Sequence, residues 1–169
     1  LFMNHMYPVD AYVRNHFRKK AIDCLVKYHI PVKIVGEGWS KYKSSDENFV
    51  KREIPVEFGL SFEKIAKEHI LLNNSPFFNH GAHDRIFAGM ANHCAVLSDE
   101  NPYLNAKLKK RENIMLYSLK DEKSLKDMAE ELLINHAFCK EIQENAYQEF
   151  LQNHTWECRV RQLLKVIER

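Results

Sequence analysis

The sequence lacks the long apolar runs, targeting segment and charge excess that would place it in a membrane or on nucleic acid. No apolar stretch approaches the roughly 20 residues of a membrane-spanning helix, and the opening LFMNHMYPVD lacks the basic segment and apolar core of a signal peptide. Lysine and arginine total 25 and aspartate and glutamate 23, which gives a net charge of +2. We therefore expect neither a membrane span nor a nucleic-acid partner.

Cysteine pairs are also missing, because no two cysteines have the Cys-x-x-Cys spacing of a metal or redox site. The four cysteines are Cys24, Cys94, Cys139 and Cys158. Their wide spacing predicts buried thiols of a cytoplasmic protein rather than a disulfide framework. The first residue is leucine instead of methionine, and it opens a predicted strand. A chain that starts inside a strand is expected to be a fragment of a longer protein.

Several chemical signatures are absent as well. The sequence has no Gly-Lys-Ser/Thr phosphate loop and no serine nucleophile elbow, which disfavours nucleotide hydrolases and α/β-hydrolases. The potential metal ligands His80, His83, Asp84, His93 and Cys94 match no compact ligand signature. We therefore expect no metal and no other cofactor.

What the sequence does contain is short apolar runs that alternate with amphipathic ones. The pattern predicts strands at 1–6, 32–35, 54–58, 70–73, 95–98 and 114–116. It predicts helices at 10–28, 62–67, 83–90, 124–133, 137–150 and 156–168, with Ser61 and Thr155 as N-caps of the second and the last. This alternation indicates an α/β fold in one domain, residues 1–169. The domain has three layers, with a parallel sheet of about six strands, and ends in C-terminal helices.

Ligands of parallel α/β sheets bind outside the carboxyl ends of the strands, and this rule selects the loops that follow each strand. Gly36 and Gly38, after the second predicted strand, either let a ligand approach the backbone or form a plain turn. Trp39 either stacks on a base or sugar or packs in the core. Phe58 and Gly59, at the end of the third predicted strand, complete this group of candidate binding residues.

The most unusual segment joins the strand at 70–73 to the following helix. Free N–H groups at a helix start and the guanidinium of Arg85 suit a diphosphate, although Arg85 could instead pair with a carboxylate. The histidines either donate to phosphate or sugar oxygens or belong to a solvated loop. Asp99, at the end of a later strand, either holds a hydroxyl or forms a turn. The candidate residues here are Asn74, Ser75, His80, Gly81, His83, Asp84, Arg85 and Asp99.

The order of these segments resembles the C-terminal domain of group 1 glycosyltransferases, in particular the branch similar to spore-maturation glycosyltransferases. The resemblance rests on ILLN at 70–73, HDRIFAGMAN at 83–92, AVLSD at 95–99, NHTWECR at 153–159 and PVKIVGEGW at 31–39, and covers nearly the whole chain. It implies a GT-B enzyme with two Rossmann-like domains and an active site between them. The C-terminal domain of such enzymes binds the nucleotide-diphosphate sugar, generally without a metal.

The resemblance implies a donor-binding domain of a hexosyltransferase-like enzyme, whose N-terminal acceptor domain is missing from this chain, so that the chain alone is inactive. Arg85 matches the arginine of that branch. Many members carry two glutamates eight positions apart, but His80 and Ala88 occupy those positions here. This departure keeps an alternative open, a non-catalytic nucleotide- or sugar-binding module. We also expect the last helix to lack part of its contact surface, unless it packs fully on the sheet.

Overall fold

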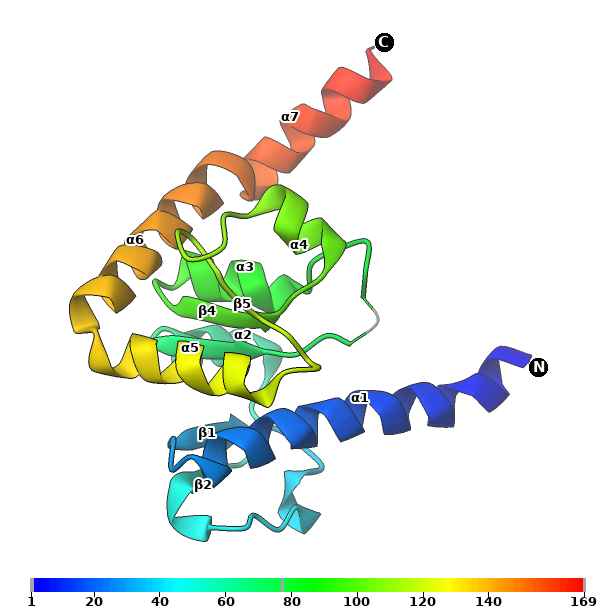
Figure 1. Ribbon diagram of the computed structural model, residues 1–169. Coiled ribbons are helices and arrows are strands. Elements are labelled where there is room, and N and C mark those ends of the chain that lie inside the picture. The colour runs from blue at the N-terminus through cyan, green and yellow to red at the C-terminus, as the bar shows by residue number, and fades with distance from the viewer. Residues whose placement is uncertain (1, 77, 169) are drawn as a thin grey trace.

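Parallel strands in two sheets, connected by helices, form the framework of the molecule (Figure 1). This computed structural model describes residues 2–76 and 78–168. The elements are α1 (Phe2–Lys27), β1 (Val32–Val35), β2 (Val50–Glu53), α2 (Phe58–Ile65), β3 (Ile70–Asn73), α3 (Asp84–Ala91), β4 (Ala95–Asp99), α4 (Pro102–Lys107), β5 (Met115–Tyr117), α5 (Glu122–Ile134), α6 (His136–Asn153) and α7 (Trp156–Ile167). The predicted α/β class is confirmed.

Both sheets are wholly parallel, so the strands of each sheet end at a common edge. β1 pairs with β2, and β4 lies between β3 and β5. In the second sheet Asn73 lies beside Ser98, and Asp99 lies beside Tyr117. The prediction of about six strands in one sheet is wrong, because the described residues form five strands in two sheets.

The predicted strand at 54–58 is wrong. Its first four residues have no regular structure, and the strand of this region is β2, which comes just before them. Pro55 has no N–H to donate to a sheet, whereas Val50 is buried in an apolar cluster beside β1. The next helix, α2, already begins at Phe58, so Ser61 is not its N-cap. Inside the helix, the hydroxyl of Ser61 donates to the carbonyl of Phe58 at 2.5 Å.

The predicted strand at 1–6 is also wrong, because residues 2–6 belong to α1; Leu1 lies outside the described residues. A short apolar run cannot be assigned to strand or helix by periodicity alone. The C-terminal half of α1 is buried, whereas its N-terminal half projects from the domain (Figure 1). Tyr7 and Tyr12 in this projecting half are 66% and 72% exposed.

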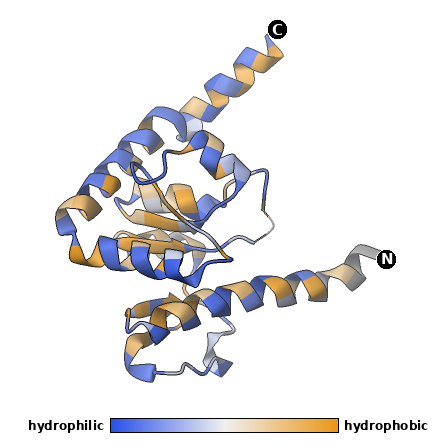
Figure 2. Cartoon of the chain, in the orientation of Figure 1, coloured by the Kyte–Doolittle hydropathy of each residue, from blue (hydrophilic) through white to orange (hydrophobic). Residues whose placement is uncertain are grey.

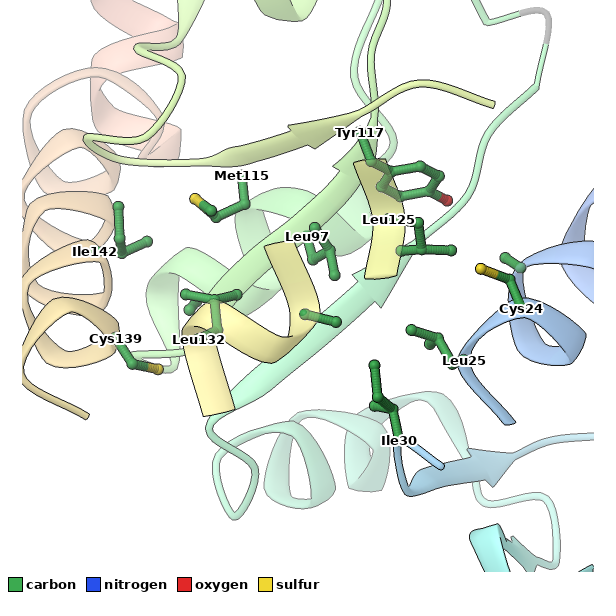
Figure 3. Close-up of a cluster of buried hydrophobic side chains, with 13 residues drawn as sticks. Cys24, Leu25, Ile30, Leu97, Met115, Tyr117, Leu125, Leu132, Cys139 and Ile142 are labelled. Carbon is green, nitrogen blue, oxygen red and sulfur yellow. The ribbon is translucent and has the colours of Figure 1, made fainter. Parts of the chain in front are cut away.

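The core confirms the three-layer arrangement. β4 is buried along its whole length. Ala95 and Leu97 on one face pack with side chains of α1, α5 and α6, as Figure 3 shows for the Leu97 side. Val96 on the opposite face packs with side chains of α3 and α4. The contact with α3 requires Gly89, because a Cβ there would lie 2.8 Å from side-chain atoms of Leu71 and Val96.

The last helix, α7, leads away from the body of the domain (Figure 1), and apolar residues are spread along it (Figure 2). Thr155 caps it as predicted, accepting a hydrogen bond from the N–H of Cys158 at 3.3 Å. Trp156 is 87% exposed, Val160 51% and Leu164 47%. The alternative of full packing on the sheet is therefore wrong, while a missing contact surface for this helix stays a prediction.

All four cysteines are free thiols, as predicted; Cys24, Cys94 and Cys139 are buried, but the prediction of a buried thiol is wrong for Cys158, which is partly exposed. Within the described residues, no helix combines the length and apolarity that crossing a bilayer requires.

Candidate functional site

Polar side chains form a buried network at the carboxyl ends of β3, β4 and β5. The amide of Asn73, which is 1% exposed, donates to the hydroxyl of Ser98 at 2.9 Å. The hydroxyl of Tyr117 donates to the backbone carbonyl of Asn73 and accepts from the amide of Asn74, both at 3.1 Å. These bonds join the ends of three strands and fix where the loop after β3 begins. The side-chain oxygen of Asn74 is buried and has no partner among the described residues.

Asp99 places a carboxylate at the centre of this edge. The side chain accepts the backbone N–H of Ser75 at 2.8 Å, which anchors the start of the loop after β3. Asp99 forms no ion pair within the described residues, and burial raises the pKa of its carboxyl group. Three of the predicted site residues, Asn74, Ser75 and Asp99, thus lie together.

The same loop ends at the N-terminus of α3, where His83 is the N-cap. The Nδ1 atom of His83 accepts the backbone N–H of Arg85 at 3.2 Å and also lies 2.5 Å from a carboxylate oxygen of Asp84. Nδ1 must carry a proton to donate to Asp84, whereas it must be unprotonated to cap the helix. Burial, and then the charges of Arg85 and Arg18, lower the pKa of His83 despite the opposing effect of Asp84. In the tautomer that caps the helix, the proton of the neutral imidazole lies on Nε2, where it can donate to a ligand.

Arg85 lies in the first turn of α3, two residues after this cap. Its guanidinium donates to the side-chain oxygen of Asn73 at 3.4 Å, a long hydrogen bond, and has no carboxylate partner within the described residues. Burial lowers the pKa of Arg85, and the charge of Arg18 on α1 lowers it further. An arginine side chain remains charged even so. Arg85 therefore presents a positive charge, unneutralised by an ion pair, at the helix N-terminus.

Sequence reasoning missed Arg18. The side chain is half-buried on α1 and forms no hydrogen bond or ion pair in the described part of the chain. In the sequence it is one of several basic residues within a predicted helix. What distinguishes it from its neighbours is that its charge acts on Arg85 and His83.

The loop between β3 and α3 is held by the N-cap of α4. The amide of Asn101 donates to the carbonyls of Phe78 and Gly81 at 2.9 and 3.2 Å. A Cβ at Gly81 would lie 3.0 Å from the ring of Phe78, so this turn is close-packed. His80 is exposed, which agrees with the solvated-loop interpretation of this residue.

The remaining candidates come after β1 and β2 along the chain. Gly36 and Gly38 have φ angles of 141° and 82°, which only glycine adopts easily, and nothing lies within 4 Å of where their Cβ atoms would be. The ring of Trp39 contacts that of Tyr42 at 5.5 Å, which favours the packing interpretation. Phe58 and Gly59 lie in the first turn of α2 rather than at a strand end. The side chain of Phe58 is 73% exposed.

Within residues 2–76 and 78–168, no three histidine, cysteine, aspartate or glutamate side chains gather as a metal site requires. His93 instead stacks on Tyr147, with ring centres 3.8 Å apart. The thiol of Cys94 donates to the carbonyls of Ile65 and Glu68. Metal-free binding stays a prediction.

The fold has counterparts among solved glycosyltransferases. HepE of Anabaena, in complex with UDP-glucose, superimposes with a TM-score of 0.71 at 14% identity, over 90% of this chain and 44% of its own. TarM of S. aureus, in complex with fondaparinux, alpha-GlcNAc-glycerol and UDP, superimposes with a TM-score of 0.73 at 15% identity. The match covers 92% of this chain and 33% of TarM. The C-terminal domain of LpcC from Francisella tularensis, a glycosyl transferase group 1 family protein, superimposes with a TM-score of 0.51 at 13% identity. The match covers 79% of this chain and 92% of that domain. This chain thus spans less than half the length of HepE and TarM.

No curated protein sequence matches the chain. A family model described as glycosyl transferase-like matches residues 14–165, which is most of the sequence. This match and the fold confirm the resemblance to glycosyltransferases, while the spore-maturation branch stays a prediction. The chain belongs to the glycosyl transferase-like family.

Proposed function

We propose that this chain is the donor-binding domain of a glycosyltransferase and binds a nucleotide-diphosphate sugar, whose glycosyl group the whole enzyme transfers to an acceptor. The observation that carries this proposal is the positive N-terminus of α3, with Arg85 unneutralised beside the polar edge formed by Asn73 and Asp99. The ligands in the HepE and TarM structures, UDP-glucose and UDP, support the ligand class.

The geometry suits a diphosphate leaving group. The helix dipole at the start of α3 favours negative charge, and the guanidinium of Arg85 can add a bidentate donor. In the capping tautomer the Nε2–H of His83 can donate to a phosphate oxygen, and the carboxylate of Asp99 can accept a hydrogen bond from a hydroxyl group. In such a site protein dipoles and cations stabilise the charge that develops on the departing diphosphate, with no metal required.

The acceptor side of the reaction belongs to another domain in this proposal. The chain covers 44% of HepE but 92% of the LpcC C-terminal domain, a pattern that supports a C-terminal half. The exposed apolar face of α7, with Trp156 and Leu164, offers a surface for the other half. A non-catalytic binding module is the second candidate, favoured by His80 and Ala88 at the two positions where many relatives have glutamates.

Calorimetric titration of this chain with UDP, UDP-glucose and other nucleoside diphosphates tests the proposal. We expect saturable binding of at least one nucleotide, unchanged by a chelator, and no sugar transfer by this chain alone. Failure of every nucleotide to bind would contradict the donor-binding role. A large loss of affinity with chelator would contradict metal-free binding. In the full-length enzyme, sugar transfer distinguishes the transferase from the non-catalytic module.

A further inference from the structure

The last helix, α7, is held to the rest of the domain at its first turns. Within the helix, Cys158 and Arg159 are partly buried and every other residue is exposed. The thiol of Cys158 donates to the backbone carbonyl of Gln152 in α6, at 3.2 Å. Beyond Arg159 the helix leads away from the body of the domain (Figure 1). The direction of α7 therefore depends on what its first turns contact.

The side chain of Arg159 reaches a buried imidazole between α6 and α7. Its Nη2 atom lies 2.8 Å from Nδ1 of His154, and Nε2 of the same ring lies 3.2 Å from a carboxylate oxygen of Glu149 in α6. The His154 side chain is 7% exposed. Its ring stacks on that of Phe87 in α3, with the ring centres 4.5 Å apart, and the guanidinium of Arg159 lies 5.9 Å from the centre of the Phe87 ring. Three helices thus meet at His154.

This arrangement requires a neutral imidazole. A guanidinium carries donors and no acceptor, so the hydrogen bond from Arg159 needs an Nδ1 atom without a proton. The proton of the ring then lies on Nε2 and is donated to Glu149. A second proton, on Nδ1, would turn the contact with Arg159 into one between two donors that are both positively charged. Arg159 must then leave the ring, and α7 loses its hydrogen bond to His154.

We propose that Glu149, His154 and Arg159 form a pH-sensitive latch, which fixes α7 while His154 is neutral and releases the helix when the imidazole binds a second proton. The proposal goes beyond donor binding and does not depend on it. An open latch lets the exposed apolar face of α7, which includes Trp156 and Leu164, take other directions. Acidification thereby changes how this face is presented to a partner.

The charges around His154 act in opposite directions. Glu149 from α6 attracts a protonated ring and Arg159 from α7 repels it, whereas α3 contributes the apolar ring of Phe87. Glu149 also acts on Lys109, whose pKa is raised by its hydrogen bond with Glu112 and, to a smaller extent, by Glu149. Burial, and then the charge of Arg159, lower the pKa of His154 despite the opposing effect of Glu149.

The sign of the pH dependence follows from this lowered pKa. The latched ring binds a proton less readily than the imidazole of the unfolded chain. The latch therefore contributes its full stability above the ordinary pKa of 6.5, and this contribution is lost as the pH falls through the lowered pKa of His154. The latch is closed at neutral pH and opens in acidic solution.

Hydrogen exchange of the α7 amides between pH 8 and 5 tests the latch, with each rate divided by the intrinsic chemical rate at the same pH. A released helix of 12 residues loses protection, because isolated helices of this length are marginal in water. We expect the protection of α7 to fall by about tenfold on acidification, the lower end of what loss of a hydrogen bond to a charged group supports. The protection of β4 should stay constant.

Two variants separate the latch from a general effect of acid. His154→Gln can accept from Arg159 and donate to Glu149 but binds no proton, so α7 should stay protected down to pH 5. Arg159→Gln should lower the protection of α7 by about tenfold at pH 8 as well, for the same lost hydrogen bond. The matched controls are His136→Gln, at an exposed histidine of α6, and Arg161→Gln, at an exposed arginine of α7. Both controls should behave like the natural chain.

NMR titration of the imidazole signals gives a second readout. The pKa of His154 should be higher in Arg159→Gln than in the natural chain and unchanged in Arg161→Gln. An unchanged pKa of His154 in Arg159→Gln would overturn the latch. So would a protection of α7 that is independent of pH in the natural chain, or an equal loss on acidification in His154→Gln. Should His154→Gln leave α7 open at every pH, the titration of Arg159→Gln still decides.

Discussion

Asp99 has surroundings that oppose its charge. The side chain is 4% exposed and has no cation partner within the described residues. It accepts one backbone N–H, from Ser75 at 2.8 Å, and lies 3.4 Å from the hydroxyl of Ser98. Burial raises the pKa of its carboxyl group above the ordinary value. The carboxylate therefore anchors the loop after β3, but its buried charge lowers the stability of the fold. Buried groups with shifted pKa values are common at functional sites.

We expect Asp99→Asn to raise the free energy of unfolding at pH 7, because its amide oxygen still accepts the N–H of Ser75 while the buried charge is gone. The natural chain binds a proton at Asp99 more readily when folded than when unfolded. The contribution of Asp99 to the free energy of unfolding is therefore greatest below the pKa of the unfolded state, and it falls as the pH rises through the pKa of the folded state. The difference in stability between Asp99→Asn and the natural chain should therefore shrink as the pH is lowered. Urea unfolding at several pH values between 7 and 4 measures the difference.

Asp99→Leu serves as the comparison, since it leaves the N–H of Ser75 without an acceptor. An unpaired buried donor costs about 1–3 kcal/mol, so this variant should be less stable than the natural chain. An advantage of Asp99→Asn that stays constant with pH would show that burial of the charge is not its cause.

At the scale of elements, Glu53 joins β2 to its neighbours. The carboxylate accepts a hydrogen bond from Lys64 on α2 and lies 3.5 Å from the ammonium of Lys33 on β1 and 3.3 Å from that of Lys51. The hydrogen bond from Lys64 is the main cause that lowers the pKa of Glu53 to about 2, with the other lysines adding to it. One side chain thereby ties together two strands and a helix.

Glu53→Gln should lower the free energy of unfolding at pH 7. Because the pKa of Glu53 is lowered in the folded state, the stabilisation is full above the ordinary value of 4.5 and disappears as the pH falls through about 2. The deficit of the variant should therefore shrink between pH 4.5 and the lowest pH at which the protein folds. Glu57→Gln, at an exposed carboxylate, is the control. Equal behaviour of both variants would contradict the role of Glu53.

The elements that the sequence predicted correctly are those with an unambiguous local signal. β3 and β4 are apolar runs with turn residues after them, and α7 has a capping threonine. β2 was missed because its outward side chains are charged and find partners only in the folded chain, as Glu53 does. α4 had a signal that was overlooked, since Asn101 caps it by accepting the N–H of Leu104 at 2.7 Å and Pro102 follows at the first helical position.

The candidate site was predictable only in part. The rule for strand ends placed Asn74, Ser75 and Asp99 together, and the structure brings them together. No such rule could place Arg18, because its position depends on how α1 packs over the sheet. Phe58 and Gly59 were predicted as site residues because a strand was expected to end there. The structure has no such strand, and both residues belong to α2.

The whole molecule consists of two unequal parallel sheets, and each has its own apolar cluster. β1 and β2 rest on a small cluster that contains the buried side chains Ile22, Val26, Ile34 and Val50. The three strands around β4 have clusters on both faces, and every residue of β4 is buried. Apolar burial supplies most of the favourable free energy of folding, so the two sheets are stabilised to very different degrees.

This inequality has a kinetic consequence. Regions with few buried apolar contacts open by themselves, at a lower free energy than the whole fold, and their amide hydrogens exchange with deuterium through that opening. We expect the amides of β1 and β2 to exchange well before those of β4, as a separate cooperative unit, in hydrogen-exchange mass spectrometry. Simultaneous exchange of both sheets would contradict this. Gly36 and Gly38, which the sequence predicts to bind the nucleotide, follow the carboxyl end of β1. We therefore expect a bound nucleotide to slow exchange in this more easily opened sheet.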